Sequence, residues 1–207
     1  YHQLNHVPVT TAGASYSSLN NLEEFLFVRL ASTGYGRNYG VESMLEKRFD
    51  NQFYLMGSGS LYKSTYGNDL NNQLNTRFNG RYTATAAAGK EFNRSEKGRV
   101  FGIHTRFMAF GGQRQLHIDE AASALAGTTI FDQTQGYSVL LPDYKRLDLR
   151  LSWRKVKLKS TRTLSLDIQN LAGIQNVAGY YFDTYKQKVL TRYQLGIIPV
   201  LTWRLDF

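Results

Sequence analysis

Charged residues and histidine recur at alternate positions along several segments of the sequence, and their chemistry suits a binding site. His104 and Arg106 have this spacing, and Arg146 and Asp148 repeat it further along the chain. Alternate residues of a β-strand point to the same side, so each set forms a charged row. Such a row contacts an anionic ligand or, as we favour, makes a charge-balanced structural wall. The candidate residues are His104, Arg106, Arg146, Asp148, Arg150, Arg154, Arg192 and Arg204.

Motifs for catalysis or metal binding are weak. The chain has no cysteine, which excludes a thiolate metal site and a cysteine nucleophile. His117-Ile118-Asp119-Glu120 offers adjacent metal ligands without a second cluster, which indicates a polar loop. Gly57-Ser58-Gly59-Ser60 is not expected to lead from a strand into a helix, so it is no nucleophile elbow. We therefore predict a protein that is not an enzyme and has no metal or cofactor.

Composition favours β-structure and does not favour nucleic-acid binding. The 207 residues include 14% aromatic residues and 18 glycines but only three prolines. The formal charge is +9, from 25 Lys and Arg against 16 Asp and Glu, and the charges are spread along the chain. Nucleic-acid tails concentrate positive charge in blocks, so we predict no nucleic-acid partner.

The clearest structural pattern is the final segment. Its odd positions are apolar or aromatic: Tyr193, Leu195, Ile197, Pro199, Leu201, Trp203, Leu205 and Phe207. The even positions include Arg192, Arg204 and Asp206. This period of two predicts one long strand over 190–207. Pro199 cannot donate a ladder hydrogen bond, so we expect a bulge or bend there.

The same alternation predicts an antiparallel sheet of about eight strands. The expected strands are 1–8, 36–48, 52–66, 80–93, 98–110, 145–156, 162–171 and 190–207. A short helical turn is expected at 118–126, inside a loop. The segment Phe53–Tyr66 alternates poorly, and its pattern leaves open which of its faces is apolar.

Connections between these strands alternate between short and long. Short turns are expected near 49–51, 94–97 and 157–161, and long loops at 9–35, 67–79, 111–144 and 172–189. In an up-and-down sheet, alternate connections lie at opposite ends. Short turns at one end and long loops at the other are typical of bacterial outer-membrane barrels. The C-terminus then lies at the short-turn, periplasmic end.

A membrane location follows from strand length and loop asymmetry. No run of apolar residues is long enough for a transmembrane helix, but barrel strands are apolar only at alternate positions. A lipid environment leaves only helices and closed barrels as spanning structures. We therefore predict an all-β, up-and-down transmembrane β-barrel segment in the outer membrane of a Gram-negative bacterium, with membrane lipid as a partner.

Several ordered motifs resemble one family, the TonB-dependent outer-membrane receptors. The segment Gly34–Glu42, followed by Leu45–Phe49, resembles a strand-and-turn motif of these receptors. Three further segments resemble motifs of these receptors: Leu141-Pro142-Asp143-Tyr144, Asp167-Ile168-Gln169-Asn170 and, near the C-terminus, Tyr193–Pro199. The ordered set covers nearly the whole chain, although no single motif is specific.

The resemblance implies a nutrient importer. Such receptors have a barrel of about 22 strands with a plugged lumen, and TonB supplies energy through the plug. Residues 1–207 would then form the C-terminal part of the barrel, with loops that help to bind ligand, and we expect the plug to be missing. The resemblance also implies that Trp203, Leu205 and Phe207 are the signal read by the outer-membrane assembly machinery. A surface lipoprotein is a further candidate partner.

Two alternatives stay open at this stage. One is a self-contained eight-stranded barrel with a structural or pore role, since eight strands close around a filled interior. The other is a soluble, basic β-protein that binds nucleic acid or a glycan. The transported ligand is not readable from the sequence.

Overall fold

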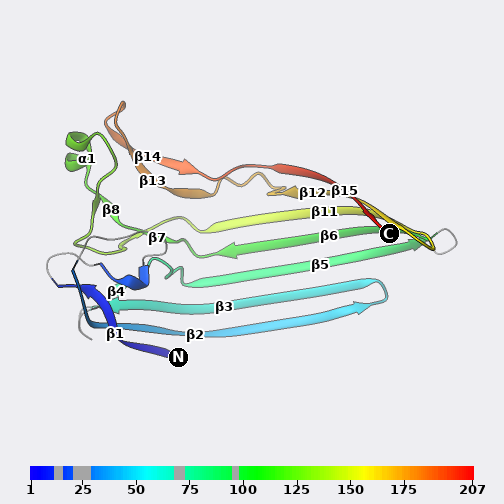
Figure 1. The fold of residues 1–207 in the computed structure, drawn as a ribbon, viewed down its shortest axis with the longest axis horizontal. Helices are drawn as coiled ribbons and strands as arrows, with labels where there is room; N and C mark the ends of the chain where they lie inside the picture. Colours follow the sequence, from blue (N-terminus) through cyan, green and yellow to red (C-terminus); the bar gives the residue numbers. More distant parts are fainter. Residues whose placement is uncertain (12–15, 21–28, 68–72, 95–97) are drawn as a thin grey trace.

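One large antiparallel sheet dominates the structure, which is mostly β (Figure 1). It is a computed structural model that describes residues 1–11, 16–20, 29–67, 73–94 and 98–207. A short strand, β4 (Leu74–Asn75), pairs with β3 at the margin of the sheet. The long strands, in order across the sheet, are β1 (His2–Thr10), β2 (Leu30–Asp50), β3 (Phe53–Gly67), β5 (Tyr82–Arg94), β6 (Arg99–Phe110), β11 (Tyr144–Val156), β12 (Thr161–Gln169) and β15 (Ile198–Asp206).

Short and long connections are segregated as predicted. The turn between β2 and β3 consists of Asn51 and Gln52, both with positive φ (49° and 66°), as tight hairpin turns require. Residues 157–160 join β11 to β12 at the same end, and the C-terminus also lies there (Figure 1). The turn expected at 94–97 falls largely outside the described residues. The described parts of the long connections lie at the opposite end (Figure 1).

The long-loop end carries small structural elements of its own. The predicted helical turn is α1 (Glu120–Ala126): the Asp119 carboxylate accepts a hydrogen bond from the Ala122 amide at 2.9 Å, and Gly127 ends the helix with φ of 65°. The other elements are η1 (Ser18–Asn20), β7 (Arg114–Gln115), β8 (His117–Ile118), β9 (Phe131–Asp132), β10 (Val139–Leu140), β13 (Val177–Asp183) and β14 (Lys188–Tyr193).

The final strand differs from the prediction. The segment 190–207 is divided between β14, which pairs with β13 in a separate hairpin, and β15, which pairs with β12. Residues 194–197 between them belong to no strand. The bulge expected at Pro199 is also absent, because Pro199 pairs in register with Ile168. Pro199 is tolerated there because β15 is an edge strand of the described sheet.

The register gives the sheet one apolar and one polar face. Residues paired across strands share a face, and the paired row Ile103, Leu151, Leu166 and Leu201 crosses four strands of the apolar face. Lys90 of β5, which pairs with Ile103, is the next member of this row. The same rule settles the face of β3. Leu61 pairs with Val41, so the odd positions of β3 belong to the apolar face.

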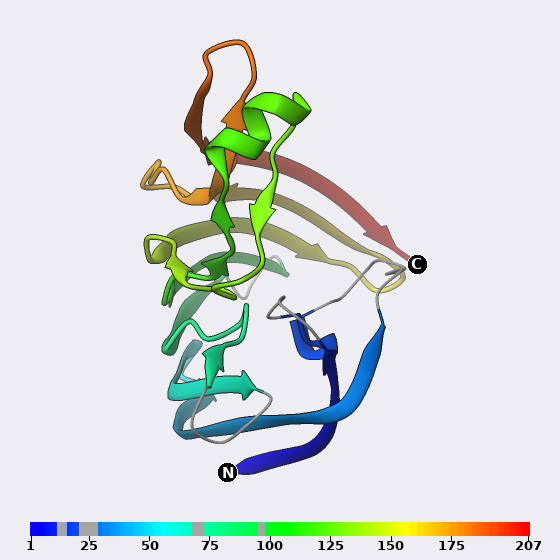
Figure 2. The same ribbon diagram turned by 90° about the vertical axis from the view of Figure 1, so that its left-hand side faces the viewer.

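The polar face is the concave one. The strands follow an arc, and η1 lies on its inner side (Figure 2). Leu19 of η1 lies against Gly36, where an added Cβ would be 2.9 Å from the leucine Cδ1. Gly36 shares the polar face of β2 with Glu42, because both occupy even positions of that strand. The apolar face is therefore the convex, outer one.

Little of the sheet's apolar surface is buried. The buried apolar side chains lie toward the long-loop end and include Val9, Tyr66 and Phe182. On the outer face, by contrast, Val41 is 75% exposed and Leu201 is 71% exposed. An apolar face of this extent is unfavourable in water and requires a covering medium or partner.

The sheet is open in the part of the chain that the structure describes. Its two edge strands, β1 and β15, do not pair with each other. These residues therefore do not form the closed eight-stranded barrel considered from the sequence. None of the described helices has the length and apolar character needed to cross a bilayer.

Candidate functional site: the polar inner face

The register brings together most of the charged residues singled out in the sequence. Arg106 pairs with Asp148, and His104 pairs with Arg150, so β6 and β11 present one continuous charged surface. Seven of the eight candidates occupy this polar inner face: His104, Arg106, Arg146, Asp148, Arg150, Arg154 and Arg204.

Asp148 is the centre of this charged surface. Its carboxylate accepts hydrogen bonds from Arg106 Nη2 at 2.8 Å and from Arg146 Nη2 at 3.0 Å. The backbone N–H of Asn170 donates to the other oxygen at 3.0 Å. Only 13% of the Asp148 side chain is exposed, so these donors replace most of its contact with water. The arrangement fixes two arginines and the start of the β12–β15 connection around one carboxylate.

Two further arginines continue the surface toward the short turns. Arg150 donates to Ser165 Oγ at 3.3 Å and lies 3.6 Å from the Asp167 carboxylate. Arg154 reaches across β6 to Glu91 of β5, with Nη2 3.2 Å from the carboxylate oxygen. Each arginine is matched by an acid, which supports the charge-balanced reading of this wall.

Glycines on the inner face make room for larger neighbours. His104 Nδ1 lies 3.3 Å from the Tyr54 hydroxyl, and the two rings stack with centroids 5.8 Å apart. A Cβ at Gly89 would overlap both rings, so only glycine fits between them. A hollow of about 200 Å³ opens beside His104, between Arg150 and Arg154. Its lining can hydrogen-bond a small polar molecule.

Two of the candidate residues differ from the others. Arg192 lies on β14, in the separate hairpin, and so is not part of the charged inner face; the alternation of the final segment had placed it there. Arg204 is on the inner face but bonds Asp206 of its own strand at 2.7 Å. Alternation shows which residues of a strand share a side but not which strand they pair with. The positions of Arg192 and Arg204 therefore could not be distinguished from the sequence.

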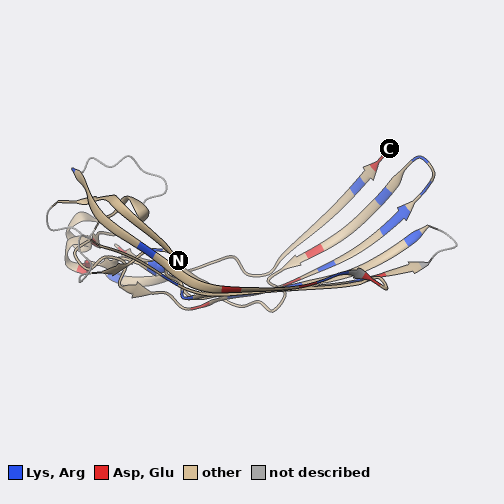
Figure 3. Ribbon diagram, turned by 90° about the horizontal axis from the view of Figure 1, so that it is seen from below, with Lys and Arg blue, Asp and Glu red and all other residues tan. Residues whose placement is uncertain are grey.

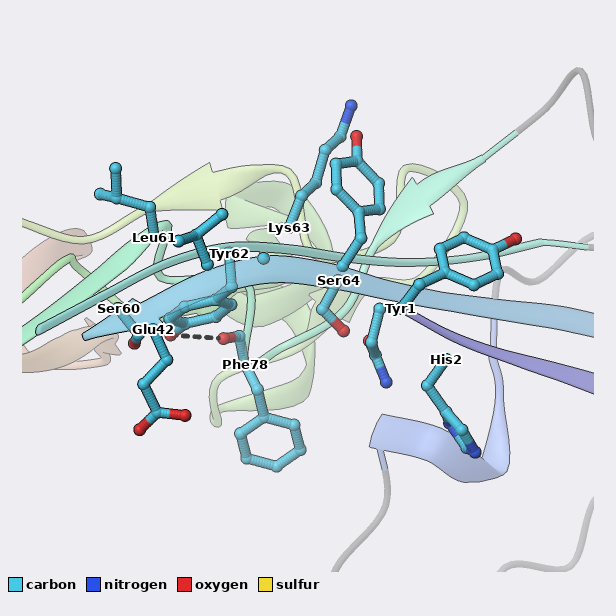
Figure 4. A pocket seen from close by; sticks show the side chains of 13 residues that line it. Tyr1, His2, Glu42, Ser60, Leu61, Tyr62, Lys63, Ser64 and Phe78 are labelled. Atoms are coloured by element: carbon cyan, nitrogen blue, oxygen red, sulfur yellow. Dashed lines mark hydrogen bonds between the residues drawn. The ribbon is translucent and has the colours of Figure 1, made fainter. Parts of the chain in front are cut away.

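A second hollow was not predicted from the sequence. It has a volume of about 510 Å³ and lies along β1, β2 and β3, between Tyr1, Glu42 and Tyr62. Figure 4 shows Ser60 and Phe78 on one side of the strands and Lys63 on the other, with the Tyr62 hydroxyl donating to the Phe78 carbonyl at 3.2 Å. Part of its lining is Phe78, which lies in a loop. A loop has no periodic pattern that would show from the sequence which strands it lies against.

The described residues suit binding by hydrogen bonds and charge. Among them no group of histidine and acidic side chains is arranged to hold a metal ion. Asp119 caps α1, and His117 pairs in backbone register with Asp132 in the small β8–β9 ladder. The motif around His117 thus has a structural role in the loop.

Asp143 joins three segments at the long-loop end. Its carboxylate accepts hydrogen bonds from the Tyr82 hydroxyl at 2.8 Å, the Arg81 guanidinium at 3.0 Å and the Gly112 amide at 3.1 Å. The Tyr82 hydroxyl, followed by the Gly112 amide and Arg81, lowers the pKa of Asp143 below its usual value, against an opposing effect of burial.

Acid should loosen this junction. Because the pKa of Asp143 is lowered on folding, its stabilising effect is present above the ordinary aspartate pKa of about 3.9 and is lost as pH falls through the lower folded value. We expect the Gly112 amide to exchange its hydrogen faster, relative to the intrinsic rate, at pH values well below about 4 than at neutral pH. Asp143→Asn should remove this difference; an unchanged profile in the variant would contradict the assignment.

The residues of the predicted assembly signal, Trp203, Leu205 and Phe207, lie at the C-terminal end of the chain. Trp203 pairs with Leu164 and Leu205 with Arg162, which places both on the outer face. Trp203 is 65% exposed and Phe207 is 99% exposed. Leu205 is half-buried, and a role of these three residues in recognition stays a prediction.

Comparison with known protein families, curated proteins and solved structures gives no match for this chain.

Proposed function

We propose that this chain forms part of the wall of a transmembrane β-barrel in the outer membrane of a Gram-negative bacterium. The observation that carries the proposal is the division of the curved sheet into an exposed apolar outer face and a charged, hydrogen-bonded inner face. A barrel wall in a bilayer needs this arrangement, because lipid meets the outside and water fills the lumen.

The height of the apolar band supports a membrane. On β11 the outer face is apolar from Leu147 to Trp153 and is bounded by Lys145 and Lys155. On β2, Arg37 and Lys47 bound a stretch of the same length, which is apolar or aromatic except for Ser43. From one flanking cation to the other, ten residues of strand span about 34 Å, and a tilt of about 35–45° leaves the two cations about 24–28 Å apart in height. Outer-membrane barrels have an apolar band about 25 Å tall.

We further propose that the barrel is that of a TonB-dependent nutrient importer rather than an enzyme. The ordered motifs of the sequence support this, and so does the open sheet, whose free edges at β1 and β15 accept further strands. The inner face and long loops would then contribute to ligand contact, and TonB would act through a plug. The outer-membrane assembly machinery would read Trp203, Leu205 and Phe207, and a surface lipoprotein stays a candidate partner.

Fractionation and uptake test this function. The protein that contains this chain should co-sediment with outer membranes and require detergent for extraction. Cells lacking it should fail to grow on one nutrient of a sole-source panel, and cells lacking TonB should show the same defect. Growth that is unaffected by loss of TonB, together with a steady conductance in planar bilayers, would favour a passive pore instead.

A further inference from the structure

A row of positive charges crosses the outer face near the short turns. Arg99 of β6 pairs with Lys155 of β11, and Lys155 pairs with Arg162 of β12. The three residues therefore lie side by side on three neighbouring strands. The turn that joins β11 to β12 adds the exposed Lys157 and Lys159. We call these five residues the basic rim.

Nothing in the described chain neutralises the basic rim. None of its five residues forms an ion pair with a described carboxylate, although each inner-face arginine has one. Like charges directly opposite one another across strands destabilise a sheet. Figure 3 shows Lys and Arg recurring near the turns at the end of the sheet where the C-terminus lies. The row therefore calls for an anionic partner outside the described residues.

The position of the basic rim indicates what that partner is. Trp153 and Leu164 pair with each other and are the outer-face residues next to Lys155 and Arg162, on the side toward the middle of the sheet. The row therefore lies at the border of the apolar band. Arg99 and Arg162 are exposed there. At this border of a bilayer the nearest groups are lipid phosphates. Their negative charge complements the row, and long cationic side chains reach from apolar surface toward headgroups.

We propose that the basic rim binds the headgroups of anionic phospholipids in the leaflet that meets the short turns. This inference rests on the proposed membrane function and adds a lipid preference to it. The site recognises a lipid surface, with several phosphates bound at once by a line of cations. It is not a pocket for one free phosphate.

A lipid-association measurement tests the inference. The whole protein that contains this chain is reconstituted in phosphatidylcholine bilayers, and the association of spin-labelled phosphatidylglycerol is compared with that of spin-labelled phosphatidylcholine. We expect the wild type to prefer phosphatidylglycerol. The triple variant Arg99→Gln, Lys155→Gln, Arg162→Gln should lose this preference by at least about fivefold, the effect of one cation near an anionic surface.

Matched variants separate the basic rim from general charge. Arg37→Gln, Lys63→Gln, Lys145→Gln removes as many cations at the opposite border and should keep the preference. Exchanging Arg and Lys at the three rim positions should also keep it and shows that the sites tolerate change. An unchanged preference for phosphatidylglycerol in the rim variant would overturn the inference. So would loss of the wild-type preference when inorganic phosphate is added at matched ionic strength. Failure of the wild type to enter bilayers would overturn the proposed function itself.

Discussion

Replacing Leu201 by arginine is expected to lower the free energy of unfolding by about 2–4 kcal/mol in a bilayer, because the charge would lie at mid-height of the lipid-facing surface. Leu201 belongs to the apolar row that crosses four strands and pairs with Leu166. In water the same change would be nearly neutral, within about 0.5 kcal/mol, since Leu201 is 71% exposed and has little packing to lose. The size of the effect thus reports the surrounding medium.

Thr202→Arg is the matched control for this prediction. Thr202 is the next residue of β15, is also exposed, and lies on the inner face opposite Ser165. We expect it to cost less than about 1 kcal/mol, because a wet lumen solvates the guanidinium. Reversible denaturant unfolding in lipid vesicles, followed by tryptophan fluorescence, gives both values. Equal costs for the two variants would contradict the assignment of faces.

Replacing Asp148 by alanine is expected to lower the free energy of unfolding by about 2–3 kcal/mol. The change leaves Arg106, Arg146 and the Asn170 amide without their shared acceptor. Breaking a fully buried ion pair costs about 3–5 kcal/mol, and the estimate is reduced because 51% of the Arg106 side chain is exposed. Denaturant unfolding of the same reconstituted protein measures it.

Asp206→Ala is the control for the Asp148 variant. Asp206 binds a single arginine, Arg204, and both side chains are largely open to solvent (44% and 72% exposed). Exposed ion pairs contribute less than about 1 kcal/mol, so little stability should be lost. If both aspartate variants cost the same, Asp148 does not organise the inner face.

Much of the sheet could be predicted because alternation is a local property of the sequence. Leu147, Leu149 and Leu151 show the outer face of β11 without knowledge of its neighbours. Turn positions, the loop asymmetry and α1 followed from equally local signals. The same reasoning placed the β6 and β11 candidates on one face, because the period of two fixes which side chains point together.

Partners across strands could not be predicted, since they depend on register. Arg154 bonds Glu91 of a strand two positions away, a contact that no local pattern encodes. The division of the final segment has the same origin. Residues 190–193 alternate like the strand that follows but pair with β13, whose Tyr180 is bound through both its backbone N–H and carbonyl by the Gln115 amide. This long-range contact holds the hairpin within the loop assembly.

The most direct test of the central claim, that the outer face meets lipid, is a spin-label scan of residues 147–154 on β11 in bilayers. Our account predicts that labels at odd positions collide mainly with oxygen and labels at even positions mainly with a polar nickel chelate. Contact with lipid should be greatest at 149 and 151, midway between Lys145 and Lys155. Free access of the nickel chelate to the odd positions would show that this face is in water and would contradict the account.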